Sequence, residues 1–289
     1  MKPGTFEWHP AHSADEAIAL LAEYAPQDGR VIAGGQSLVP SMALRLAFPS
    51  HLIDINGVTE FAQVRVEGSE LVIGACVRHA AFHAPVEPGP LGRLLTQVVH
   101  NIAHYPIRQR GTFCGSLANA DPASEWCLVA ATLGARMVAK SVRGSRTIEA
   151  DDWFQGIMTT ALEEDELLAE VRLPLLPDGS HAGFYEFSRR AGDYALAMAL
   201  VSWRDDGGTM RDVRIGTGGV EAQPRRIPAA EALLEGRKVT PGATSDAIDA
   251  AAAAVSAAVD PLEDVHTSAG YRRDLIGTAV RRAFAQAGS

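Results

Sequence analysis

The sequence predicts an α+β protein divided into subdomains. Strand and helix candidates alternate over residues 1–56, short strands mix with helical runs over 57–177, and strands followed by helices fill 178–289. A chain of 289 residues that is 47% hydrophobic can bury a large core without disulfides. We therefore expect an N-terminal, a central and a C-terminal subdomain with these bounds.

Residues 1–56 predict a compact β-α-β-α-β unit of α/β type. The first helix begins at the capping box formed by Ser13 and Glu16 and stops at Pro26. The second has Pro40 in its first turn and ends before Pro49. In chain order, we expect a strand at 6–9, a helix at 13–25, a strand at 30–33, a helix at 38–46 and a strand at 51–55.

A linker-like cluster of Pro174, Pro177, Asp178 and Gly179 separates the central and C-terminal subdomains. Before the cluster, we expect strands at 64–66, 71–73, 136–139 and 167–173, and helices at 91–102 and 122–133. After it, we expect strands at 184–188, 195–203 and 210–216, a turn at 205–208, and helices at 229–234, 246–258 and 269–287.

Composition excludes several classes of protein. The net charge of 26 − 35 = −9 disfavours nucleic-acid binding, which requires clustered Lys and Arg. The three cysteines, an odd number without a CxxC, indicate reduced thiols in the cytoplasm and are too few for an iron–sulfur cluster. The N-terminus lacks the apolar segment of a signal peptide, and no apolar run is long enough to predict a membrane span.

The first glycine-rich loop, Ala33-Gly34-Gly35-Gln36-Ser37, lies between a predicted strand and a predicted helix. Consecutive glycines allow a positive φ and close backbone approach, and the N–H groups that follow can bind an anion such as pyrophosphate. A tight turn without a ligand is an equally good interpretation. The loop is neither G-x-G-x-x-G nor GxxxxGK[ST], which disfavours a nicotinamide site and a P-loop.

The second glycine-rich segment covers residues 110–122, predicted as a long polar loop before a helix that begins near Pro122. Its binding candidates are the hydroxyls of Thr112 and Ser116, the glycines Gly111 and Gly115 and, just beyond, the carboxylate of Glu125. Two such segments predict a two-sided clamp on one extended ligand that contains phosphate. A dinucleotide fits this better than a mononucleotide.

The motifs AGGQS at 33–37 and RGTFCGSLANADPASE at 110–125 resemble the two FAD-binding motifs of the flavoprotein (medium) subunit of molybdenum hydroxylases, of the carbon monoxide dehydrogenase and xanthine dehydrogenase type. The match continues through RRAGDYA at 189–195 and YRR at 271–273, and so covers essentially the whole chain. The resemblance implies a PCMH-type (vanillyl-alcohol-oxidase-like) FAD-binding fold of two subdomains. A C-terminal subdomain of antiparallel strands and helices would follow, beside the isoalloxazine.

The resemblance also implies how FAD is held. Residues 33–37 would hold the pyrophosphate from one side, and residues 112–116 would hold it and the ribityl chain from the other. Leu162 would pack near the cofactor, and Tyr194 would lie close to the flavin ring. No catalytic residue is implied on this chain. The implied cofactor-binding residues are Ala33, Gly34, Gly35, Gln36, Ser37, Leu38, Ile102, His104, Ile107, Gly111, Thr112, Phe113, Cys114, Gly115, Ser116, Ala118, Asn119, Asp121, Glu125, Leu162 and Tyr194.

Two residues depart from the family pattern. Cys114 stands where the family usually has Gly, so either the backbone there takes a φ that a β-carbon tolerates or Cys114 faces the cofactor. Glu186 stands about where some members have a Lys near the flavin. An acid there would disfavour an anionic reduced flavin, so either Glu186 points away or the local potential is lower than in relatives.

The resemblance further implies a division of labour among subunits. Substrate is oxidised at a molybdenum cofactor on a large subunit, and electrons pass through two [2Fe–2S] centres of a small subunit to FAD on this chain, in a dimer of heterotrimers. FAD would then reduce an external acceptor. The alternatives are a self-sufficient FAD-dependent oxidoreductase and a non-catalytic module of the same fold.

Two histidine pairs, His79 with His83 and His100 with His104, have the spacing of four that places both rings on one helix face. Neither pair has the HExxH glutamate. We interpret these histidines as surface or capping residues and expect no metal ligands on this chain.

Overall fold

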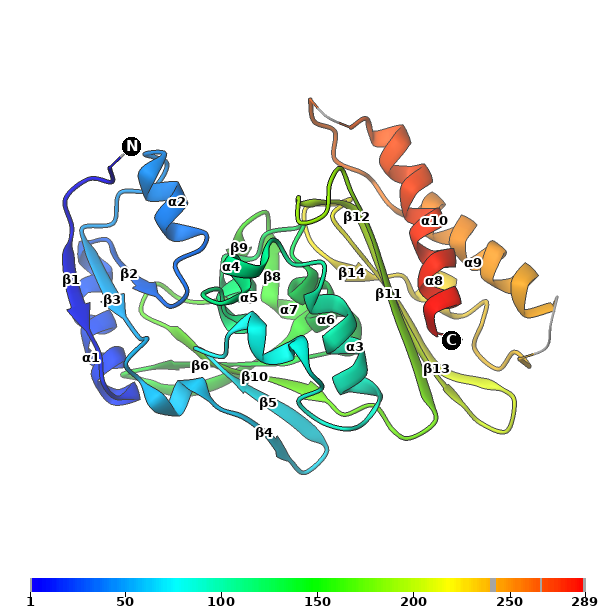
Figure 1. The fold of residues 1–289 in the computed structure, drawn as a ribbon, viewed down its shortest axis with the longest axis horizontal. Helices are drawn as coiled ribbons and strands as arrows, with labels where there is room; N and C mark the ends of the chain where they lie inside the picture. The colour runs from blue at the N-terminus through cyan, green and yellow to red at the C-terminus, as the bar shows by residue number, and fades with distance from the viewer. Residues whose placement is uncertain (1, 240–242, 266, 288–289) are drawn as a thin grey trace.

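The structure, a computed structural model, describes residues 2–239, 243–265 and 267–287. In this part of the chain three larger sheets follow one another along the molecule (Figure 1). Their strands fall in residues 7–54, 64–174 and 180–226. Residue 1 and residues 288–289, which end the predicted first and last subdomains, lie outside the described residues. The predicted subdomain boundaries after residues 56 and 177 stay predictions.

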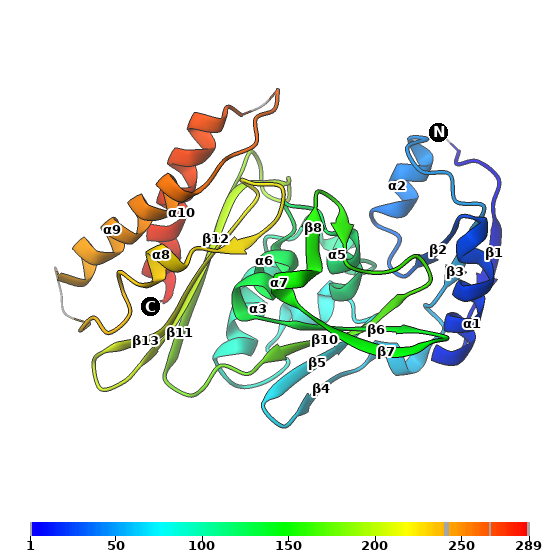
Figure 2. The ribbon, with the colours of Figure 1, turned by 180° about the vertical axis from the view of Figure 1, so that it is seen from behind.

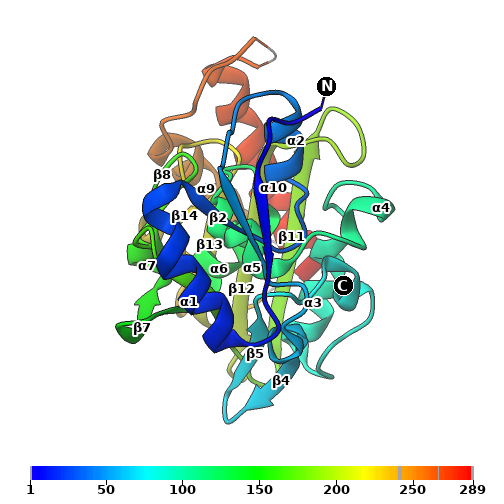
Figure 3. The same cartoon turned by 90° about the vertical axis from the view of Figure 1, so that its left-hand side faces the viewer.

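The first sheet has the order β1-β3-β2 and is parallel. Figure 3 faces the end of the molecule formed by β1, α1 and α2. Ser13 caps α1, because its hydroxyl accepts from the Glu16 amide at 3.1 Å. The expected alternation is confirmed as β1 (Glu7–Pro10), α1 (Ala14–Tyr24), β2 (Gly29–Ile32), α2 (Leu38–Ala43) and β3 (His51–Asp54).

The second sheet has the order β4-β5-β10-β6-β7 and is antiparallel. Its strands are β4 (Val64–Glu67), β5 (Glu70–Gly74), β6 (Arg136–Ser141), β7 (Gly144–Glu149) and β10 (Leu167–Pro174). The sequence did not predict β7, because only Ile148 of its six residues is buried and the strand lacks an apolar alternation. Helix α7 (Ala150–Trp153) and the hairpin of β8 (Phe154–Gly156) and β9 (Thr159–Thr160) are also short and were not predicted.

The helices of the central unit correct one prediction. The segment 110–122, expected to be a long loop, contains a helix, and the next helix begins at Glu125 rather than near Pro122. Thr112 caps the unexpected helix, and Phe113 and Leu117 supply a buried face that small neighbours conceal in the sequence. The helices are α3 (Pro90–Val99), α4 (Tyr105–Arg108), α5 (Phe113–Asn119) and α6 (Glu125–Leu133).

The third sheet is antiparallel, in the order β11-β12-β13-β14. Helices α9 and α10 cover one of its faces, and α3 and α6 pack against the other (Figure 2). This arrangement confirms the predicted C-terminal strands and helices. The elements are β11 (Ser180–Ser188), β12 (Ala195–Asp205), β13 (Met210–Gly218), β14 (Arg225–Arg226), α8 (Pro228–Glu231), α9 (Ala243–Ala258) and α10 (Ala269–Ala287).

Strand β12 is buried on both faces and separates two hydrophobic cores. Met198 and Leu200 pack into the core shared with the first two sheets. Ala199 and Val201, one residue further along in each case, pack against α9 and α10. Because side chains alternate along a strand, β12 packs one face into each core and so joins the C-terminal unit to the rest of the molecule.

The described residues contain no helix that is both long enough and apolar enough to cross a bilayer.

Helix α10 lies so close to β11 that only a glycine fits between them. A Cβ added at Gly183 would lie 2.0 Å from the carbonyl oxygen of Ala283. We therefore expect Gly183→Ala to lower the free energy of unfolding by about 1–3 kcal/mol, because α10 must move outward. Urea unfolding followed by circular dichroism measures this change.

The matched control is Gly270→Ala at the start of α10, where an added Cβ meets no atom within 4 Å. Its expected effect is within about 0.5 kcal/mol of zero. Equal stability of the two variants would show that the close approach of α10 to β11 is not a packing constraint.

Candidate functional site

A cleft of about 320 Å³ lies between the first sheet and the central unit. Strands β2 and β3 are parallel and end at Ile32 and Asp54, so their carboxyl ends open onto the same edge of the sheet. Ligands of parallel sheets characteristically bind at this edge. The segments 33–38 and 111–119 supply most of the cleft wall.

The loop after β2 exposes a row of backbone donors to the cleft. Gly35 has φ 69°, the left-handed region in which glycine is unstrained. Among the described residues, the N–H groups of residues 34–38 have no intramolecular acceptor. Successive free amides in a turn form a concave anion site, which is the arrangement that a pyrophosphate needs.

The opposite wall is the start of α5. The Thr112 hydroxyl accepts from the Gly115 amide at 3.0 Å and so holds the first turn. A Cβ at Gly115 would lie 2.6 Å from that hydroxyl oxygen. The amides of Thr112 and Cys114 have no acceptor among the described residues, so this wall also offers donors.

The two walls touch each other through backbone atoms. A Cβ at Gly34 would lie 2.3 Å from the Arg110 carbonyl oxygen and 2.6 Å from the Gly111 Cα. The contact is reinforced because Asn56 donates to the Ala33 carbonyl at 2.8 Å, and Arg78 donates both to Asn56 and to the Arg110 carbonyl. The two loops therefore face each other across the cleft, which is the arrangement that a two-sided clamp requires.

The donor set fits a dinucleotide such as FAD. The cleft presents amides and hydroxyls on both sides, which bind phosphate oxygens without formal positive charge. This explains how a chain with a net charge of −9 can still bind an anionic ligand.

Most of the predicted binding residues line this cleft. They are Ala33, Gly34, Gly35, Gln36, Ser37, Leu38, Gly111, Thr112, Cys114, Gly115, Ser116, Ala118, Asn119 and Leu162. The residues that do not line it are Ile102, His104, Ile107, Phe113, Asp121, Glu125 and Tyr194. His104 and Tyr194 are exposed near the loop 189–194, where a Cβ at Gly192 would lie 2.6 Å from the His104 ring.

Phe113 belongs to the core. Its ring packs against Phe82 and Trp126, with centroids 5.6 and 4.8 Å away, and is fully buried. Its amide donates to the Val77 carbonyl at 3.0 Å. The Phe113 side chain therefore holds α5 in place and does not face the cleft.

Cys114 has an ordinary helical backbone, which is the first of the two alternatives for this position. Its thiol is buried at the cleft wall and donates to the Ile73 carbonyl at 3.4 Å. Burial raises the pKa of this thiol well above its usual range. Cys114 is therefore a protonated, packed thiol.

Glu186 neither points to solvent nor meets a cation. It lies on β11 and shares a hydrogen bond with the buried Glu125 at the start of α6, while its Oε2 is buried without a hydrogen-bond partner. Burial raises the pKa of Glu125 to about 7 and that of Glu186 to about 9. The pair therefore retains a proton at neutral pH.

His79 was not predicted as a residue of the cleft, and the interpretation of His79 as a surface or capping residue was wrong. The ring is 4% exposed, its Nδ1 accepts from the Trp126 indole at 2.9 Å, and it lines the cleft beside Gly111. Burial, with Arg108 and Arg78 nearby, lowers the pKa of His79 to about 3. Because no spacing rule connects His79 with Trp126, no signal in the sequence indicates this role.

Other missed cleft residues lie in or directly beside predicted strands. They are Arg30, Val31, Ile32, Ile55, Ala75, Glu166, Leu167 and Leu168. The rule that ligands bind at the carboxyl ends of parallel strands would have indicated Ile32 and Ile55.

The carboxyl pair predicts a pH dependence of stability. The folded state binds more protons than the unfolded state from the ordinary pKa of 4.5 up to about 9, so the free energy of unfolding falls as pH rises through this range. Glu186→Gln removes one of the paired carboxyls and supplies an amide donor to Glu125. We expect this variant to lose most of the decline between about pH 5 and about pH 9, measured by urea unfolding.

Glu164→Gln, at an exposed glutamate, is the control and should keep the wild-type pH dependence. A Glu186→Gln protein with an unchanged decline would contradict a shared buried proton.

Two family models match nearly the whole chain. Residues 4–176 match the FAD binding domain in molybdopterin dehydrogenase, and residues 182–287 match the CO dehydrogenase flavoprotein C-terminal domain. The nicotine 6-hydroxylase medium subunit of Paenarthrobacter nicotinovorans is 39% identical over 290 residues, covering 100% of this chain and 99% of that protein. The carbon monoxide dehydrogenase medium chain of Hydrogenophaga pseudoflava is 35% identical, covering 98% and 97%.

Solved structures show the same fold. Carbon monoxide dehydrogenase from Hydrogenophaga pseudoflava, in a form lacking the Mo-pyranopterin moiety, matches with a TM-score of 0.93 and 37% identity over 100% of this chain and 99% of that chain. Quinoline 2-oxidoreductase from Pseudomonas putida 86 matches with a TM-score of 0.90 and 35% identity over 99% and 98%. The predicted α+β fold, the cofactor FAD and the oxidoreductase class are confirmed. The chain belongs to the FAD-binding medium subunits of molybdenum hydroxylases, of the carbon monoxide dehydrogenase type.

Proposed function

We propose that this subunit takes electrons from a [2Fe–2S] partner subunit and passes them from FAD to an external acceptor. The observation that supports this best is the clamp of two touching glycine segments with free amides on both walls. When bound, FAD supplies a centre that accepts and releases electrons singly or in pairs. The contribution of this chain is to bind that cofactor, orient it and limit its access to water.

We assign the pyrophosphate to the amides of residues 34–38 and to the start of α5 at Thr112. Ala118, Asn119 and Leu162 line the same cleft and would contact the remainder of the cofactor. His104 and Tyr194 are exposed close to one another's loops, which supports a role for them at the end of the cofactor that faces the partner or the acceptor.

The cysteines support the need for a partner. Cys76, Cys114 and Cys127 are all free and buried, and burial raises the pKa of each thiol. Iron–sulfur clusters bind thiolates, generally four of them. We therefore assign the clusters to a small [2Fe–2S] subunit and the molybdenum cofactor to a large molybdopterin-binding subunit, in a cytoplasmic dimer of heterotrimers.

Gly34→Ala tests the clamp. Its added Cβ would lie 2.3 Å from the Arg110 carbonyl oxygen, so the two walls must separate and the facing amides lose their alignment. We expect the affinity for FAD to fall about tenfold or more, the equivalent of about 1.4 kcal/mol. Titration of the flavin-free chain with FAD, followed by flavin fluorescence, measures it.

The control is Gly4→Ala, where an added Cβ meets no atom within 4 Å, and it should bind FAD as the wild type does. Undiminished FAD binding by Gly34→Ala would contradict the proposal that the two touching loops hold the cofactor. A wild-type chain that does not bind added FAD would indicate a non-catalytic module.

Purification of the tagged chain from its native cells tests its place in a complex. We expect molybdenum and iron to elute together with flavin, because the redox centres upstream of FAD lie on other subunits. Elemental analysis of the gel-filtration peak measures this. A lone chain that contains flavin, lacks molybdenum and iron, and turns over substrate by itself would instead support the self-sufficient oxidoreductase.

A further inference from the structure

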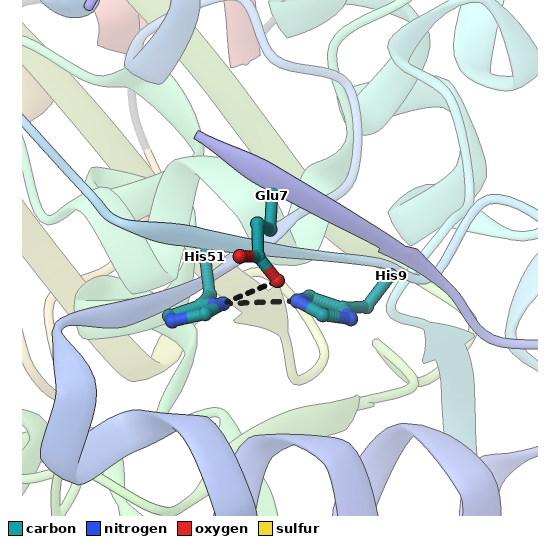
Figure 4. A group of neighbouring side chains, drawn as sticks. All are labelled: Glu7, His9 and His51. Carbon is teal, nitrogen blue, oxygen red and sulfur yellow. Dashed lines mark hydrogen bonds and ion pairs between the residues drawn. The ribbon is translucent and has the colours of Figure 1, made fainter. Parts of the chain in front are cut away.

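A cluster of Glu7, His9 and His51 lies on the first sheet (Figure 4). His51 is the first residue of β3, at the opposite end of that strand from the edge onto which the cleft opens. Glu7 and His9 are two apart on β1, so both side chains point to the same face of the sheet. β3 pairs with β1 in parallel register and places His51 opposite Glu7. Strand pairing therefore brings together residues that are 42 positions apart in the sequence.

The three ligand atoms converge on one point. His9 Nε2 lies 3.0 Å from His51 Nδ1, and His51 Nδ1 lies 3.8 Å from Glu7 Oε2. All three atoms lie within 4.8 Å of one another. Two bonds of about 2.0–2.2 Å at a tetrahedral angle place the ligand atoms of a zinc-like ion about 3.3–3.6 Å apart. The 3.0 and 3.8 Å separations are close to this spacing. The Glu7 side chain is 74% exposed and can rotate to close the longest gap.

Tyr24, at the end of α1, fixes both imidazoles. Its ring stacks on His9 with centroids 4.1 Å apart and on His51 with centroids 4.4 Å apart, at interplanar angles of 19° and 23°. One flat surface thus supports both rings, whose planes are tilted by 34° to each other, and a nitrogen of each ring faces the other ring. Rings held in this way lose little freedom when they bind an ion, which favours binding.

We propose that Glu7, His9 and His51 form a binding site for a divalent transition-metal ion of the zinc class. Two imidazoles and one carboxylate are a ligand set that zinc accepts, and the exposure of Glu7 leaves the fourth position open to water. Without the ion, one imidazole N–H donates to the other ring. When the ion binds, the ring that had donated carries its proton on its other nitrogen. Both facing nitrogens then present lone pairs to the metal.

The site would connect the N-terminal strand to the centre of its sheet. β1 is an edge strand of four residues, and β3 is the central strand. An ion that binds the folded arrangement and not the unfolded chain stabilises the fold. Acid should release the ion, because protonated imidazoles cannot coordinate it.

The test uses the full chain after treatment with a chelator and dialysis. Zn²⁺ binding is measured by calorimetric titration, and Co²⁺ binding by a titration followed by visible absorption. We expect one ion per chain, cobalt bands typical of a site with nitrogen ligands, and a higher melting temperature with Zn²⁺. His51→Ala and His9→Ala should each weaken Zn²⁺ binding by at least about tenfold. Glu7→Gln, at an exposed side chain, should also weaken it and leave the metal-free melting temperature unchanged.

His12→Ala is the matched control, because His12 follows β1 and is exposed but lies outside the cluster. It should bind Zn²⁺ as the wild type does. Absence of Zn²⁺ binding by the wild type, or equal affinity in the wild type and Glu7→Gln, His9→Ala and His51→Ala, would overturn the proposal. Because these measurements do not depend on flavin, they succeed or fail independently of the electron-transfer function.

Discussion

The contact between Gly34 and the Arg110–Gly111 backbone is the constraint on which the binding site depends. The first sheet and the central unit meet here through main-chain atoms at distances that leave no room for a β-carbon. Asn56 and Arg78 hold the same two segments by hydrogen bonds. Because both walls of the cleft begin at this contact, the free amides on each side are positioned by the meeting of two units rather than by either loop alone.

The C-terminal unit is attached in a different way. β12 packs one face into the shared core and the other against α9 and α10, so the unit cannot move without disturbing both cores. The same sheet brings Glu186 on β11 against Glu125 at the start of α6. A proton shared by two carboxyls therefore lies where the C-terminal unit joins the FAD-binding part.

Local signals in the sequence were sufficient for most elements and for the binding loops. Ser13 at a helix start, the glycines after β2 and the apolar run of β12 each act within a few residues, and the structure places them as expected. The helix α5 was missed because its buried face consists of Phe113, Cys114 and Leu117 among residues typical of loops. Phe113 was predicted to bind the cofactor because a motif places a whole segment at the site. The motif does not say which way each side chain points.

The chain's motifs alone were enough to identify the family and cofactor, since a phosphate clamp made of glycines and hydroxyls leaves a local pattern of residues. Tertiary structure was needed for every feature that depends on pairing distant segments. The neutral state of His79 comes from its burial near Arg108 and Arg78, and that of Glu186 from its burial against Glu125. The convergence of Glu7, His9 and His51 comes from the register of β1 on β3. Burial and the distance between charges set the chemistry of such groups, and both arise only once the chain has folded.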